Sequence, residues 1–156
     1  MNKQLRDAAK AGDKSYLDYL LLRISDLEKA TGIKRTLFAA CPNSITVIRA
    51  ALKSAKRNNA PIKFAATLNQ VDTDGGYTGL TPGEFVSTIH LHARNLNVES
   101  PVIIAVDHGG PWLKDIHSRE RWSYDNTMTA VKHSFEAAIE AGYDLLHVDP
   151  TIDITL

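Results

Sequence analysis

The residues best suited to chemistry are an adjacent aspartate and histidine, Asp107 and His108, which follow a short apolar run. Neighbouring residues on an extended strand point in different directions. One of the two could therefore bind a metal ion while the other transfers a proton. Glycines at positions 109 and 110 would let the backbone approach a ligand closely. The alternative interpretation is structural, with an aspartate that caps the next turn and a histidine that is merely solvated.

A second candidate pair, His147 and Asp149, belongs to the sequence Leu-His-Val-Asp. Residues two apart on a strand share a face, so both side chains could point toward one bound substrate. The competing interpretation is a buried, hydrogen-bonded polar pair. His90 and His92 are also two apart, but on a predicted helix, where such residues do not share a face. We therefore predict no metal site at His90 and His92.

A glycine-rich loop follows the second apolar run and precedes a helix start. Such a loop can bind an anion, although an ordinary turn explains the spacing equally well. It lacks the Gly-Lys-Ser/Thr of a nucleotide-binding loop and the closing Glu of a calcium loop. Its candidate substrate-binding residues are Asn69, Gln70, Gly75, Gly76, Tyr77 and Thr78.

The long segment 109–123 shows no periodicity, and loops of this length are often lids. Its charged and aromatic side chains could close over a sugar phosphate, or they could simply be solvated. They include Trp112, Lys114, His117, Arg119, Arg121 and Trp122.

The elements that must position these groups alternate along the chain. Short apolar runs predict strands, and amphipathic stretches between them predict helices, which together indicate a parallel sheet with right-handed crossovers. Polar residues follow each strand, at the edge where both (β/α) barrels and doubly wound sheets bind ligands. The predicted strands are 36–41, 62–68, 102–106 and 145–148, and the helices between them are 45–57, 82–96 and 128–141.

Two further helices, 2–11 and 15–30, are predicted before the first strand. We therefore divide the chain into an N-terminal helical extension, 1–35, and a (β/α) region, 36–156, of about four units. The four strands of this region should lie in sequential order, with the helices between them on one side of the sheet only. A complete barrel takes roughly 250 residues, so this region would be half a barrel with two unpaired strand edges. We expect such a half to pair with another half or to be excerpted from a longer protein. Apolar side chains such as Phe38, Phe64, Ile104 and Leu146 should otherwise lack cover.

Composition excludes several classes of partner. The 156 residues carry 18 basic and 18 acidic side chains, which argues against a nucleic-acid or anionic-membrane surface.

The N-terminus lacks the apolar stretch of a signal peptide, and no apolar run is long enough to span a bilayer. Cys41 is the single cysteine, so no intrachain disulfide can form. We expect a cytoplasmic protein.

Three strings resemble one family: N-Q-V-x-x-x-G-G-Y-T-G-L-T-P-x-x-F from residue 69, V-D-H-G-G-P from residue 106, and L-H-V-D from residue 146. Their order and spacing are similar to the non-catalytic subunit of tagatose-bisphosphate aldolase, over roughly residues 36–150. The resemblance implies the front half of a TIM-type barrel related to class II aldolases. It also implies that Asp107 is the catalytic proton donor, that His108 is the first ligand of a zinc ion, and that a sugar phosphate is bound.

The chain departs from the family pattern at two places: Gly109 stands where leucine is usual, and Pro150-Thr151 where Ala-Ser is usual. Class II aldolases take their other zinc ligands from later strands, so we expect an incomplete metal site and an inactive chain. The resemblance implies an accessory protein that binds a catalytic aldolase subunit or forms a homo-oligomer. The alternative is a metal-dependent aldolase or sugar epimerase that is catalytic at full length.

Overall fold

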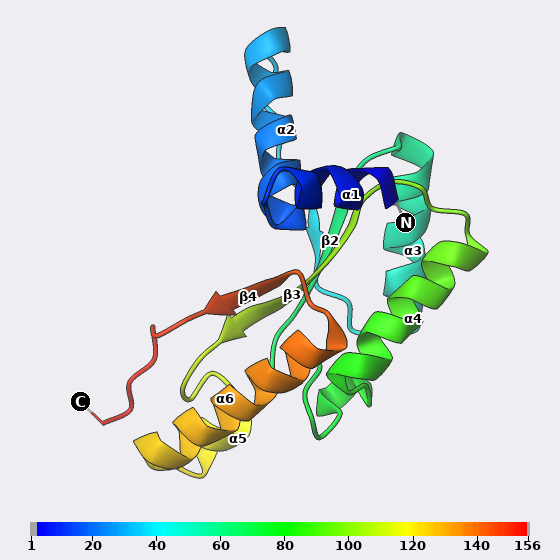
Figure 1. The fold of residues 1–156 in the computed structure, drawn as a ribbon. Helices are drawn as coiled ribbons and strands as arrows, with labels where there is room; N and C mark the ends of the chain where they lie inside the picture. Colours follow the sequence, from blue (N-terminus) through cyan, green and yellow to red (C-terminus); the bar gives the residue numbers. More distant parts are fainter. Residues whose placement is uncertain (1–2, 156) are drawn as a thin grey trace.

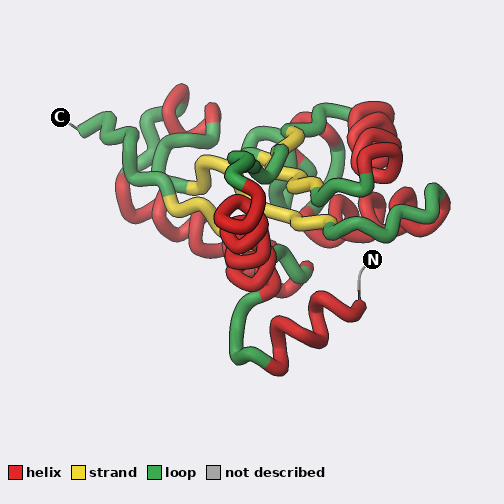
Figure 2. The backbone as a smooth tube through the Cα atoms, turned by 90° about the horizontal axis from the view of Figure 1, so that it is seen from above, coloured by secondary structure: helices red, strands yellow, loops and turns green. Residues whose placement is uncertain are grey.

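A four-stranded parallel sheet forms the centre of the molecule in the computed structural model, which describes residues 3–155. The strands follow the chain order β1-β2-β3-β4, as predicted, so this is an α/β fold. In Figure 2 the strands run through the middle of the molecule, between helices. Their bounds are Ala39–Ala40 for β1, Ile62–Ala66 for β2, Val102–Gly109 for β3 and Leu145–Val148 for β4.

The helices that follow the strands pack on one face of the sheet, as predicted (Figure 1). Residues 102, 104 and 106 of β3 face this side, where the first two join one apolar cluster and the third joins a second. A short helix, α5 (Asp115–Arg119), lies within the loop after β3. The three packed helices are α3 (Ile45–Asn58), α4 (Pro82–Asn95) and α6 (Tyr124–Ala141).

Local sequence signals explain where these helices begin. The Ser44 hydroxyl caps α3 by accepting a hydrogen bond from the backbone N–H of Val47. Helix α4 starts with a reciprocal capping box between Thr81 and Glu84. Helix α6 begins at residue 124, four residues earlier than predicted, because Ser123 is its cap. Residues 124–127 were not predicted to be helical, because this first turn lacks a stripe of apolar residues at helical spacing.

Two N-terminal helices, α1 (Lys3–Ala11) and α2 (Tyr16–Thr31), cover part of the opposite face of the sheet. Tyr16 and Leu20 bury against Ile103, whose side chain points away from α3 and α4. Arg6 forms an ion pair with Asp144 at 3.2 Å and lies 4.0 Å from the centre of the Tyr16 ring. The predicted N-terminal helices thus act as a cover for the sheet.

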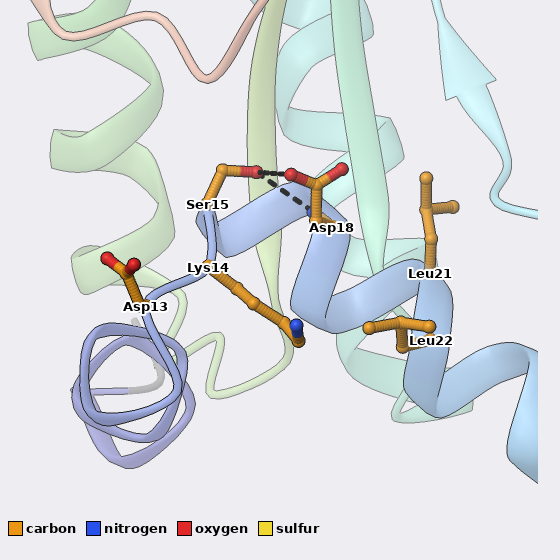
Figure 3. Close-up of a pocket in the computed structure, with 6 residues that line it drawn as sticks. All are labelled: Asp13, Lys14, Ser15, Asp18, Leu21 and Leu22. Carbon is orange, nitrogen blue, oxygen red and sulfur yellow. Dashed lines mark hydrogen bonds between the residues drawn. The ribbon is translucent and has the colours of Figure 1, made fainter.

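A surface hollow of about 560 Å³ lies where α1 turns into α2. Figure 3 shows the Ser15 cap at this turn, whose hydroxyl accepts from the backbone of Asp18 and donates to its carboxylate. Leu21 and Leu22 line the same hollow and are about half exposed. The hollow contains none of the predicted site residues.

Several strand details differ from prediction. Strand β1 pairs over two residues only, because it has a neighbour on one side and Pro42 has no N–H to donate. Phe64 and Ile104 do not lack cover: they are fully buried beneath the helices, and Leu146 packs with α6. Only Phe38, 62% exposed at the β1 edge, fits that expectation.

Within the described residues, no helix is long and apolar enough to cross a membrane.

Gly109 gives a direct test of how β3 packs on α6. A Cβ atom at this position would lie 2.3 Å from Cε1 of Phe135, which therefore fills the space that a side chain at 109 would need. Gly109→Leu should lower the free energy of unfolding by about 1–3 kcal/mol through overpacking. Adding Phe135→Ala should recover part of that loss, because the leucine takes the place of the ring. Urea denaturation measures both.

The matched control for this test is Gly83→Ala in α4, where an added Cβ meets nothing within 4 Å. This change should leave stability unchanged or raise it slightly. If Gly109→Leu were as stable as the wild type, or if the double variant lost the sum of both single effects, the packing described here would be wrong.

Candidate metal centre

An irregularity in β3 decides where the predicted chemical residues lie. The pairing of β3 with β4 shifts register between Val106 and Gly109, and His108 has a left-handed backbone with φ of 51°. Such a bulge re-aims the side chains beside it. Asp107 and His108 therefore converge, with His108 Nε2 4.0 Å from Asp107 Oδ1. The expectation that these neighbours point in different directions was wrong.

His147 approaches the same point from β4. Its Nδ1 lies 3.6 Å from Asp107 Oδ1, and it accepts a hydrogen bond of 3.3 Å from the backbone N–H of His108. The two imidazole rings have their centres 5.1 Å apart. One potential ligand atom from each of Asp107, His108 and His147 lies within 4.8 Å of the others. Asp107, predicted to be catalytic, His108, predicted to bind a metal, and His147 of β4 thus form one cluster.

Asp149 stands behind His108 and completes the group of predicted residues that the structure brings together. Its Oδ2 lies 2.5 Å from His108 Nδ1, and its Oδ1 accepts a hydrogen bond from the backbone of Thr151. The hydrogen bond with His108, followed by those from Thr151, lowers the pKa of Asp149 to about 2. The hydrogen bond with Asp149, followed by the Asp107 charge, raises the pKa of His108.

Cys41 joins this cluster without having been predicted as a site residue. Its thiol lies 3.9 Å from Asp107 Oδ2. Partial burial, and then the neighbouring Asp107 carboxylate, raise the pKa of Cys41, so the thiol is the proton donor in this contact. The signal that the sequence offered was the position of Cys41 at the end of the first predicted strand. Strands β1 and β3 are not adjacent in the sheet, however, so the predicted strand order does not bring these two residues together.

The donor set fits a divalent metal ion. Two imidazoles and one carboxylate are the ligands of many catalytic zinc sites, which leave a further position open for water or substrate. A carboxylate behind one ligand histidine is the usual supporting feature of such sites. Asp107, His108 and His147 would hold the ion, with Asp149 in the supporting position.

Asn69 and Gln70, predicted to contact substrate, are engaged in joining loops. The Asn69 amide donates to the Leu113 carbonyl and to the Asp115 carboxylate, at 3.2 and 3.0 Å. The buried Gln70 amide donates to the Pro42 carbonyl at 3.0 Å. These bonds give both side chains a structural role, and their contact with substrate stays a prediction.

The four other predicted loop residues form a tight turn that includes a 3₁₀ segment, η1 (Gly76–Thr78). The backbone N–H groups of residues 75–78 all donate within the loop, at 2.8–3.2 Å. A Cβ at Gly76 would lie 2.5 Å from the Gln70 carbonyl oxygen, so only glycine fits. An anion bound by these N–H groups would have to displace existing bonds.

The loop after β3 is folded rather than open. Trp112 and His117 are buried, and Lys114 contacts the carboxylates of Asp72 and Asp74, each at 2.7 Å. Partial burial acts to lower the pKa of Lys114, but the hydrogen bonds with these two carboxylates outweigh it, so the pKa is raised. The predicted cationic lid is therefore tied to the glycine-rich loop. A pocket of about 290 Å³ between the two is lined by Asn69, Asp74, Gly76, Tyr77, Lys114, Asp115, Ile116 and Arg119.

Comparison with known proteins shows one similar solved structure and one matching family. A crystal structure of a probable tagatose 6 phosphate kinase from Sinorhizobium meliloti 1021 is similar, with a TM-score of 0.64 and 31% sequence identity. The alignment covers 78% of this chain and 30% of that one, so this chain spans about 30% of its length. Residues 22–155 match the family described as D-tagatose-1,6-bisphosphate aldolase subunit GatZ/KbaZ-like. The chain therefore belongs to the GatZ/KbaZ-like family of tagatose-bisphosphate aldolase subunits.

Proposed function

We propose that the chain is part of a cytoplasmic accessory subunit that supports class II aldol cleavage of a ketose bisphosphate by a catalytic aldolase partner. The observation that carries this proposal is the family match over residues 22–155, from α2 to the end of the described chain. The sheet would then be the first part of a (β/α) barrel, and α1 with α2 an extension that covers its inner face.

A second function is favoured by one specific observation. The remaining metal ligands were expected on strands beyond this chain, yet His147 on β4 already lies beside Asp107 and His108. Three ligands are the usual protein contribution to a catalytic zinc site. The alternative is therefore a subunit that is itself a metal-dependent aldolase or sugar epimerase. A bound divalent ion would supply polarisation of a ketose carbonyl.

The geometry gives Asp107 two distinct oxygens for the second function. Oδ1 faces the two histidines, at 3.6 and 4.0 Å, whereas Oδ2 faces the Cys41 thiol. Oδ1 would hold the metal while Oδ2 exchanged a proton with the sugar hydroxyl. The pocket lined by Asn69, Gly76 and Tyr77 would be the site for the sugar phosphate, with Arg119 as the cationic side chain that is available beside Lys114.

Asp107→Ala and His108→Ala separate the two functions when they are made in the complete protein that contains this chain. If the subunit is catalytic, each should reduce metal-dependent turnover of tagatose bisphosphate by about a hundredfold or more, because each removes a ligand or proton carrier. A coupled aldolase assay with and without the catalytic partner measures this. His133→Ala, an exposed histidine on α6, is the matched control. Full partner-dependent activity in both variants would contradict the catalytic role and favour the accessory role.

The proposed half barrel predicts that the 156-residue chain associates. Among the described residues β1 pairs only with β2 and β4 only with β3, and Phe38 and Val148 are more than 60% exposed. Covering such a side chain stabilises by about 1.5–3 kcal/mol. We expect sedimentation of the purified chain to show a dimer, or a complex with a complementary barrel half. A cooperatively melting monomer at micromolar concentration would contradict this, and would mean that α1 and α2 suffice as cover.

A further inference from the structure

We propose that Asp149 is a positioning residue, which holds the His108 ring so that Nε2 faces Asp107 and, in the neutral ring, carries no proton. This inference rests on the metal centre proposed above. It assigns Asp149 a role through His108 in place of the predicted direct contact with substrate.

Both carboxylate oxygens of Asp149 already have partners, and the residue is buried. It is only 4% exposed, and a buried carboxylate needs partners to remain charged. Its Oδ2 is taken by His108 Nδ1 at 2.5 Å and its Oδ1 by the Thr151 backbone N–H at 3.0 Å. Because both oxygens are engaged and almost none of the residue is exposed, little of this carboxylate is open to a substrate or metal ion.

The consequence for His108 follows from hydrogen-bond chemistry. An ionised carboxylate can only accept, so Nδ1 of His108 must carry the proton in their contact. In the neutral ring the lone pair is then on Nε2, which is 4.0 Å from Asp107 Oδ1. The His108 side chain is 55% exposed, so surrounding atoms alone would not fix its rotation. Asp149 supplies the missing constraint.

The backbone is arranged to bring Asp149 to this position. Its N–H donates to the Gly109 carbonyl at 3.0 Å, which extends the β3–β4 pairing past the bulge. A Cβ at Gly110 would lie 1.7 Å from the Asp149 carbonyl oxygen, so only glycine allows the two strand ends to meet here. The close approach and the buried carboxylate together make the contact a built feature of the fold.

Asp149→Asn in the full chain tests the inference with almost no change in shape. The Thr151 N–H requires an acceptor, so the asparagine should keep its carbonyl oxygen there and turn its NH₂ toward His108. His108 Nδ1 must then accept, which moves the ring proton to Nε2. Ring ¹⁵N NMR of the metal-free chain at about pH 9, where imidazole is neutral, should show the proton on Nδ1 in the wild type and on Nε2 in the variant. Affinity for Zn²⁺, measured by calorimetry, should fall about 10–100-fold.

Asp153→Asn is the matched control, because Asp153 makes the same turn with Thr155 but is exposed and contacts no histidine. It should change neither the NMR signature nor Zn²⁺ affinity. A wild-type His108 protonated on Nε2, or an Asp149→Asn variant that binds Zn²⁺ as tightly as the wild type, would overturn the inference. Wild-type protonation on Nδ1 without any Zn²⁺ binding would support the positioning role and overturn the metal centre.

Discussion

The whole candidate centre depends on one local departure from regular strand geometry, the bulge at Asp107 and His108. On an unbroken strand these neighbours would face opposite sides of the sheet. The register shift and the left-handed backbone of His108 turn both toward His147. A backbone of this kind costs on the order of 1 kcal/mol and persists only where its surroundings hold it. Here Asp149 holds the His108 ring and His147 accepts the His108 backbone N–H.

The loops around the strand ends give this arrangement a fixed frame. Asn69 and Lys114 tie the glycine-rich loop to the loop after β3, and Gln70 joins it to the end of β1. A metal centre needs its ligands held to within a fraction of an ångström, which side chains on tied strand ends achieve better than side chains on free loops. Residues that looked like substrate contacts in the sequence therefore serve first to hold the loops together.

Alternation and capping made most of the fold predictable from sequence. The bounds of β4, the Thr81–Glu84 capping box and the sequential parallel order follow from local signals, because each depends on a few neighbouring residues. The bulge could not be predicted, because it exists only in the pairing of β3 with β4. The same holds for Cys41, whose contact with Asp107 spans two non-adjacent strands. The cover that α2 gives to Ile103 depends on how a separate segment docks.

The central claim is that Asp107, His108 and His147 converge on a single metal ion. X-ray absorption at the zinc edge on the Zn²⁺-loaded 156-residue chain tests it most directly. The spectrum should show two histidine nitrogens at about 2.0–2.1 Å together with oxygen ligands. The second nitrogen should disappear in the His147→Ala variant. A zinc ion surrounded by oxygen alone, or a spectrum unchanged by loss of His147, would contradict the claim.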